Sequence, residues 1–167
     1  GDHRDLHLSL RRQRQMCIRD SHYRATKKNT KKINKKDIFL CDSGGQYKYG
    51  TTDVTRTICF SKPKKNIKNI FTRVLKGHIA VVKSNLNKYS SGNLIDIRAR
   101  KFLKEINLDY QHGTGHGVGF FLNVHEGPQG ISKFNKIKLR EGMILSNEPG
   151  YYLSLIHISE PTRRRGI

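Results

Sequence analysis

Two aspartates in residues 42–57, DSGGQYKYGTTDVTRT, are the first candidates for chemistry. β-Branched and apolar runs at 38–40 and 55–60 flank three glycines, and together they predict two strands joined by a hairpin-like turn. An antiparallel hairpin returns Asp53 to Asp42, and residues directly opposite on one face lie about 5 Å apart. Two carboxylates at that distance repel each other unless a positive charge separates them, which favours a divalent cation. The alternative is that both aspartates only cap turns.

Three histidines share a second segment, residues 112–128, HGTGHGVGFFLNVHEGP. They are His112, His116 and His125, and glycines without Cβ atoms between them let a ligand or another backbone approach closely. A lone histidine is usually structural, but this density indicates a site. The neighbours His125 and Glu126 alternatively form a simple surface pair.

A third acid, Glu148, lies in SNEPGYY, where it is expected at the end of a strand that a proline and a glycine fix in place. Two Asp, one Glu and one His form an oxygen-rich donor set with one nitrogen, which favours Mn or Co and permits Fe or Zn. Two such ions about 3.5–4 Å apart can share a carboxylate and a hydroxide. Hydrolysis is the reaction that this set serves best, with histidines donating to the oxyanion and shuttling a proton.

The elements that must position these residues belong to one domain of mixed α+β structure. The chain has 167 residues, of which 35% are hydrophobic, enough for a packed core and too many for a disordered tail. Helical spacing of apolar residues predicts a long helix after Pro63 and a second helix from about Asp96, its expected N-cap. An apolar run at 143–145 leads to Glu148. The helical positions are Ile67, Ile70, Phe71, Val74, Leu75, Val82 and Leu86, then Ala99, Phe102, Leu103 and Ile106.

Charge and cysteine content narrow the class of protein. The chain carries 33 Lys and Arg against 13 Asp and Glu, a net charge of +20. Nucleic acid is not the expected partner, because the lysines of 27–36 lie among Asn and Thr and aromatic residues do not alternate with the basic runs. Cys17, Cys41 and Cys59 form no CxxC pair, which predicts reduced thiols. No long apolar run or signal-like segment is seen, so a cytoplasmic location is expected.

The two ends of the chain differ from the region between them. Residues 1–21 and 153–167 show neither helical nor strand periodicity. The strings MCIRDS and LSLIHISEPTR within them resemble translated sequencing-adaptor read-through, so both ends are interpreted as non-native tails. The alternative is that they are ordinary basic termini. Residues 22–152 are the predicted domain, and they stay basic without the ends.

The strings DSGGQYKYGTTDVTRT, HGTGHGVGFFLNVHEGP and SNEPGYY, in this order and spacing, closely resemble the catalytic domain of the Xaa-Pro aminopeptidases (aminopeptidase P). These enzymes are members of the pita-bread metallopeptidases. HYRAT at 22–26 also resembles the family's substrate-site segment, and the resemblance covers residues 22–152. It implies an α+β, partial pita-bread (creatinase/aminopeptidase) fold, in which helices flank a curved antiparallel sheet.

Residue by residue, the resemblance implies that Asp42, Asp53, His116 and Glu148 bind two divalent ions, with Asp53 bridging them. Manganese is the usual metal, and Co2+, Zn2+ or Fe2+ are possible. The implied catalytic residues are Glu148, the general base toward the nucleophilic water, together with His112 and His125. His22, His112 and His125 contact the substrate, and His125 shuttles the proton. The implied substrate is a peptide with proline second, which is cut after its first residue, and the full-length parent is a homodimer.

The sequence departs from the family in one ligand. The family needs a second bridging Glu on the strand after SNEPGYY, and Glu160 does not fill this role because it lies out of register and precedes Pro161. The opening elements of the family's catalytic domain and its N-terminal domain are also missing. A weakly active or inactive fragment is therefore predicted. The alternatives are another pita-bread hydrolase, of prolidase or methionine aminopeptidase type, and a metal-free pita-bread binding module.

Overall fold

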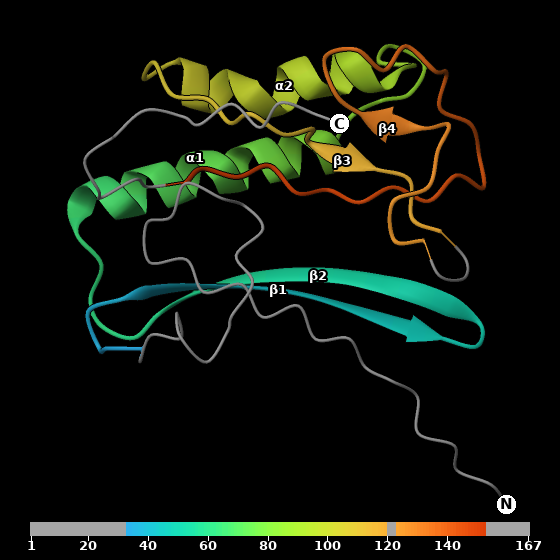
Figure 1. Ribbon diagram of the computed structural model, residues 1–167. Helices are drawn as coiled ribbons and strands as arrows, with labels where there is room; N and C mark the ends of the chain where they lie inside the picture. The colour runs from blue at the N-terminus through green and yellow to red at the C-terminus, as the bar shows by residue number, and fades with distance from the viewer. Residues whose placement is uncertain (1–32, 120–122, 153–167) are drawn as a thin grey trace, which may run out of the picture.

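The computed structural model describes residues 33–119 and 123–152, which form two layers. Two helices lie side by side in one layer, and a long curved β-hairpin runs beneath them (Figure 1). Each of the two sheets has two antiparallel strands. The elements are β1 (Ile38–Tyr47), β2 (Gly50–Cys59), α1 (Lys65–Val82), α2 (Gly92–Lys104), β3 (Gly115–His116) and β4 (Gly130–Ile131).

The hairpin is longer than the sequence predicts. The predicted hairpin is confirmed, and its turn consists of Lys48 and Tyr49, between Gly45 and Gly50. Gly44, Gly45 and Gly50 themselves pair within the strands. The physical reason lies in the partner strand: β2 is rich in β-branched residues, which favour extended pairing across the glycines. The hairpin therefore carries both aspartates well inside its ladder.

Helix α1 follows the predicted apolar spacing but ends at Val82, one turn before the expected Leu86. Leu86 lies instead in a turn over residues 86–88, before which the N–H of Asn87 donates to the side-chain oxygen of Asn85 at 2.9 Å. The one buried residue of α1 is Gly77, where a Cβ would lie 2.5 Å from the carbonyl oxygen of Ala99. Glycine thus permits close packing of the two helices.

Helix α2 begins earlier than predicted, at Gly92, with Ser91 as its N-cap residue in extended conformation. Asp96 is therefore not the N-cap but lies inside the helix, where it is 2% exposed. Its carboxylate binds Arg100 and Thr114 instead of the helix's own amides. The local preference of Asp for N-caps is overridden here by tertiary partners.

The core lies where α2 meets the segment that follows it. Ala99 and Leu103 are buried as predicted, and Phe102 and Ile106 are only half-buried. Helix α2 packs against β4, and its side chains Asp96 and Arg100 bond to Thr114 and to the carbonyl oxygen of His112, which fixes the histidine segment on the helix. The buried hydrophobic residues are Ile95, Ala99, Leu103, Tyr110 and Ile131.

The strand expected before Glu148 is not formed. Residues 143–152 are extended but irregular, and Leu145 forms a single antiparallel bridge with Gly117. Further along, the N–H of Glu148 donates to the carbonyl oxygen of Thr114 at 2.8 Å. These bonds run in the manner of a strand pair, so Glu148 is still delivered beside the histidine segment.

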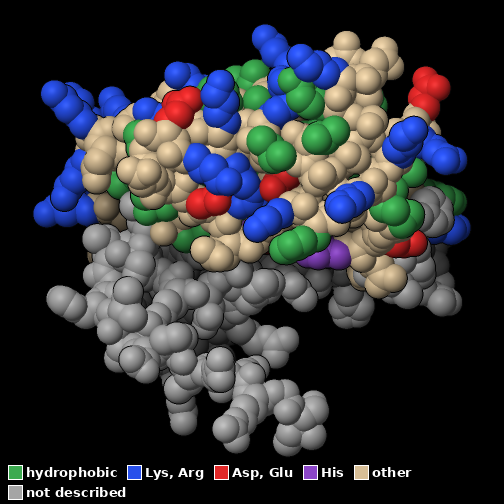
Figure 2. All heavy atoms as spheres, turned by 90° about the horizontal axis from the view of Figure 1, so that it is seen from above, with side chains coloured by type: hydrophobic (Ala, Val, Ile, Leu, Met, Phe, Trp, Pro, Cys, Tyr) green, Lys and Arg blue, Asp and Glu red, His purple; other side chains and the backbone are tan. Residues whose placement is uncertain are grey.

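The surface over the helices mixes charge types. Seen from the helical side, Lys and Arg side chains lie among acidic, polar and hydrophobic ones (Figure 2). Within the described residues, Cys41 and Cys59 are free thiols, as predicted, and Cys17 lies outside them. In the same part of the chain, none of the helices has the length and apolar character needed to span a membrane.

Candidate metal centre

His116 is the centre at which the predicted residues meet. It ends the short strand β3, and its backbone N–H donates to the hydroxyl of Ser146 at 2.9 Å. Its ring Nε2 lies 3.1 Å from Oδ2 of Asp53 and 2.9 Å from Oε1 of Glu148. One ring nitrogen thus joins a carboxylate from the hairpin with a carboxylate from the C-terminal segment.

The second ring nitrogen of His116 fixes the orientation of the imidazole. Nδ1 donates to the carbonyl oxygen of Gly117 at 2.8 Å. Because this bond keeps a proton on Nδ1, the lone pair of a neutral ring is left on Nε2, which faces the two carboxylates. Histidines that bind metals are usually oriented by such a bond to the other nitrogen.

Asp42 and Asp53 lie on the same face of the hairpin, as diagonal neighbours. Asp53 pairs with Gly44 and Asp42 pairs with Thr55, so the directly opposite arrangement expected from the sequence is wrong by two residues along the strand. The two carboxyl groups nevertheless interact. The hydroxyl of Thr55 donates to Oδ1 of Asp42 at 3.1 Å, which orients that carboxylate. The diagonal pairing follows from the turn at residues 48–49, which sets the register.

Glu148 is held by a hydroxyl that it shares with His116. Ser146 Oγ donates to Oε1 of Glu148 at 2.7 Å while accepting the backbone N–H of His116. A second contact fixes the same segment on α1: the side-chain amide of Asn147 donates to the carbonyl oxygen of His78 at 3.0 Å. Ser146 was not among the predicted site residues, although its position two residues before Glu148 places its hydroxyl close enough to bond to that carboxylate.

The electrostatics of the centre are those of a cation held between acids. Burial alone lowers the pKa of His116, but hydrogen bonds to Asp53 and Glu148 outweigh it and raise the pKa to about 10. The hydrogen bond from His116 in turn lowers the pKa of Asp53, against the opposing effect of burial. At neutral pH, His116 is therefore an imidazolium and Asp53 is ionised.

His125 lies against His116 rather than apart from it. The two rings stack with centroids 3.7 Å apart at an angle of 28°. Ligand atoms of Asp53, His116 and His125 lie within 4.8 Å of one another. The alternative of a simple surface pair with Glu126 does not describe this packing, although His125 is exposed to solvent.

His112 is connected to the centre through Tyr152. The hydroxyl of Tyr152 lies 2.9 Å from Nε2 of His112. Nδ1 of the same histidine lies 2.7 Å from the carbonyl oxygen of Gly113. Burial, followed by the negative charges of Glu148 and Asp42, raises the pKa of Tyr152 to about 12. Tyr152 was not selected from the sequence. His22, the remaining predicted substrate contact, lies outside the described residues.

The residues present fit a divalent cation. Three carboxylates and one imidazole converge, and the proton on Nε2 of His116 holds together the same two acids that a cation would. The correct ring nitrogen faces inward, and the low pKa of Asp53 keeps that ligand ionised. Oxygen-rich sets with one nitrogen suit Mn2+ or Co2+, with Fe2+ and Zn2+ as further options.

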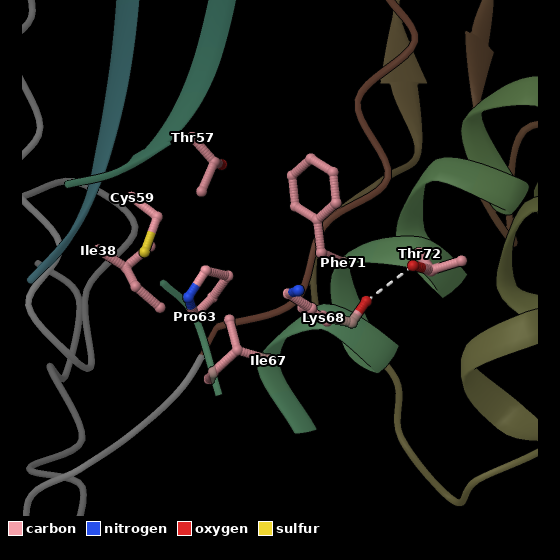
Figure 3. Close-up of a pocket in the computed structure, with 8 residues that line it drawn as sticks. All are labelled: Ile38, Thr57, Cys59, Pro63, Ile67, Lys68, Phe71 and Thr72. Carbon is pink, nitrogen blue, oxygen red and sulfur yellow. Dashed lines mark hydrogen bonds between the residues drawn. The ribbon is translucent and has the colours of Figure 1, made fainter. Parts of the chain in front are cut away.

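A cavity of about 320 Å3 lies elsewhere, between the open end of the hairpin and α1 (Figure 3). Its lining is largely apolar, and among the residues that the structure describes Lys68 is the one charged residue in it. Along α1, the hydroxyl of Thr72 donates to the carbonyl oxygen of Lys68 at 2.8 Å. The lining residues are Ile38, Thr57, Cys59, Pro63, Ile67, Lys68, Phe71 and Thr72. No acid or imidazole lines it, so the cavity does not belong to the metal centre.

Comparison with known proteins gives a consistent result. The model of metallopeptidase family M24 matches residues 17–166. Probable Xaa-Pro aminopeptidase P of Coprinopsis cinerea is 52% identical over 134 residues, which are 78% of this chain and 22% of that protein. Aminopeptidase P2 of Arabidopsis thaliana is 51% identical over 133 residues, 78% of this chain and 19% of the relative. The chain thus spans about a fifth of the length of the curated relatives it matches.

Two solved structures extend the comparison. The X-prolyl aminopeptidase of Caenorhabditis elegans, a cytosolic enzyme with a di-nuclear active site, superposes with a TM-score of 0.73 at 40% identity, covering 80% of this chain and 22% of that one. The prolidase of Pyrococcus horikoshii OT3 gives a TM-score of 0.66 at 33% identity, covering 74% of this chain and 35% of that one.

Proposed function

Because the chain belongs to metallopeptidase family M24 and has part of its pita-bread fold, we propose that it carries most of the active site of a proline-specific metalloaminopeptidase. The parent enzyme removes the first residue from peptides with proline in the second position. Support comes from the identity of about half of the aligned residues to proteins named Xaa-Pro aminopeptidase P. The match to a prolidase is weaker, at 33% identity.

The observation that carries the proposal is the convergence at Nε2 of His116. Asp53 and Glu148 both lie within 3.1 Å of this one nitrogen, although they are distant in the sequence. Asp42, Asp53, His116 and Glu148 are the proposed metal ligands, with Asp53 bridging two ions. We assign Mn2+ as the physiological metal, with Co2+, Zn2+ or Fe2+ as substitutes, because the donor set is rich in oxygen.

When bound, the divalent ions supply an acidified water molecule and polarise the scissile carbonyl. Glu148 takes the proton of the attacking water, and its shared hydrogen bond with Ser146 aims Oε1 toward the centre. His125, exposed and stacked on His116, carries that proton to the leaving amine. His112 and His22 contact the peptide, and Tyr152 holds the ring of His112 by its hydroxyl.

We propose further how this chain relates to a longer parent protein. Residues 22–152 are a partial catalytic domain, and residues 1–21 and 153–167 are non-native tails. The fifth ligand, a second bridging glutamate, is missing, because Glu160 does not fill its place. The parent enzyme is a cytoplasmic homodimer that binds neither nucleic acid nor membranes.

The chain as it stands is expected to bind one metal ion well and a second weakly. Asp53, His116 and Glu148 hold the first, and only Asp42 and Asp53 remain for the second. Isothermal titration of the 167-residue chain with Mn2+ measures this stoichiometry. Asp53→Asn is expected to remove the tight site. The matched control is Asp37→Asn, which changes the same side chain in the turn before β1.

Activity assays separate the alternatives. Mn2+-dependent release of the first residue from an Xaa-Pro-Yaa tripeptide is expected to be weak or undetectable for this chain and strong for a parent chain extended at both ends. Robust turnover by the 167-residue chain overturns the prediction of weak activity. Preference of the extended chain for an Xaa-Pro dipeptide indicates a prolidase, and failure of the extended chain to bind Mn2+ indicates a binding module.

A further inference from the structure

Outside the centre itself, the most heavily engaged polar residue is Arg100 on α2. Its side chain is 11% exposed, and its guanidinium donates in four directions. Two bonds go to carboxylates, Asp96 at 2.7 Å and Asp109 at 2.8 Å. Two more go to backbone carbonyl oxygens, those of Tyr110 and His112, each at 2.7 Å. A planar fork of five N–H donors is suited to such a junction, and a lysine cannot reproduce it.

Arg100 also contacts the segment through an aromatic ring. The guanidinium carbon lies 4.0 Å from the ring centroid of Tyr110, within the range of a cation–π contact. Tyr110 is 4% exposed, and burial raises its pKa to about 12, so its hydroxyl stays protonated and donates. This hydroxyl bonds to the hydroxyl of Thr114.

Thr114 completes the connection between α2 and the metal centre. Its side chain is fully buried, and its hydroxyl donates to Oδ1 of Asp96 while accepting from Tyr110. Asp96 thus uses one carboxylate oxygen for Thr114 and the other for Arg100. The carbonyl oxygen of Thr114 accepts the N–H of Glu148 at 2.8 Å.

This network fixes the backbone around His112 and just before His116. Thr114 lies midway between His112 and His116 in the sequence, and its carbonyl oxygen accepts the backbone N–H of Glu148. A buried polar network in which each member is satisfied orders its segment strongly, because breaking one bond leaves another buried group unpaired. The side chains that form the network, those of Arg100, Asp96, Tyr110 and Thr114, are not among the residues assigned to metal or substrate binding.

We propose that Arg100 and Thr114, joined through Asp96, are positioning residues that hold the ligands His116 and Glu148 in register for the cation. The inference rests on the proposed function of the centre as a metal site. Partners that orient metal ligands typically change metal affinity by 10- to 100-fold when removed. We therefore expect Arg100→Met and Thr114→Val to weaken metal binding at least about tenfold.

The chain offers a matched control in Arg73. This residue also connects two elements, since its guanidinium donates to the carbonyl oxygen of Phe102 at 2.6 Å and to Glu105 at 2.8 Å. It joins α1 to α2 without touching the histidine segment. Arg73→Met is therefore expected to lower the melting temperature while leaving metal affinity unchanged. Thr114→Ser keeps the hydroxyl and is expected to restore affinity to within about threefold of the wild type.

The test titrates the 167-residue chain and each variant with Co2+ and follows the visible absorption of the bound ion. A parallel measurement records amide hydrogen exchange of Glu148 in the metal-free proteins. Faster exchange at Glu148 and weaker Co2+ binding in Arg100→Met and Thr114→Val, with Arg73→Met and Thr114→Ser unaffected, support the proposal. Unchanged exchange and affinity in Arg100→Met overturn it. A wild-type chain that gives no saturable Co2+ spectrum refutes the metal site instead, and the exchange data still decide the positioning role.

Discussion

Metal binding by this chain is expected to compete with a proton on His116. Hydrogen bonds to Asp53 and Glu148 raise the pKa of His116 to about 10, so Nε2 is protonated at neutral pH. A cation that binds this nitrogen must displace the proton, because the metal ligand is the neutral imidazole. The apparent affinity is therefore expected to rise about tenfold for each pH unit above neutrality.

The size of the effect follows from the pKa. At pH 7, His116 lies about three pH units below its pKa of about 10, so the apparent affinity is about a thousandfold lower than for the deprotonated ring. At 1.36 kcal/mol per unit, this competition costs about 4 kcal/mol of binding free energy. A histidine with the ordinary pKa of 6.5 imposes almost no such cost at the same pH.

Calorimetric titration with Mn2+ between pH 6.5 and 8.5 measures this linkage directly. Repeating each titration in two buffers with different ionisation enthalpies counts the protons released. We expect about one proton per tightly bound ion and a logarithmic slope near one throughout the range. An affinity that levels off above about pH 7.5, or binding without proton release, refutes the reasoning.

Three further predictions concern stability. In the metal-free chain, the stabilisation that His116 gives to the folded state is fully present below pH 6.5 and is lost as the pH rises through about 10, because folding raises the pKa of His116. The difference in melting temperature between the wild type and His116→Gln, measured in EDTA, should therefore shrink over that range. Gly117→Ala places a Cβ 1.9 Å from the carbonyl oxygen of Glu126 and should cost about 1–3 kcal/mol in urea unfolding, whereas Gly50→Ala, with no atom within 4 Å, should cost less. Leu103→Ala, at a residue 1% exposed, should cost about 2–5 kcal/mol, and Ile97→Ala on the same helix, 63% exposed, should stay within about 0.5 kcal/mol; equal losses would contradict the assigned core.

Sequence patterns predicted the local elements well where one periodicity dominated. The apolar spacing after Pro63 located α1, and the burial of Ala99 and Leu103 confirmed the inward face of α2. The failures came from rules that consider only neighbours in sequence. Asp96 matched the preference of aspartate for N-caps, but its side chain bonds to Arg100, one helical turn further along α2, and to Thr114 in the histidine segment. The hairpin turn lies in the region predicted, but the apolar and β-branched runs did not show that the strands extend through the glycines up to residues 47 and 50.

The candidate metal ligands could be proposed from the sequence, whereas the way in which they meet could not. The family resemblance selected Asp42, Asp53, His116 and Glu148, but it contained no information on the diagonal register of the aspartates, which the turn at residues 48–49 determines. Nor did it show that His125 stacks on the ring of His116. Such contacts depend on how separate segments pack together, which one sequence does not specify.

A crystal of the chain soaked in Mn2+ tests the central claim most directly. An anomalous difference map is expected to show one strong peak at ligand distance from Nε2 of His116 and from carboxylate oxygens of Asp53 and Glu148, which now contact one another through His116. A map without a peak there, in which Nε2 of His116 still bonds both carboxylates, contradicts the assignment of this cluster as a metal centre.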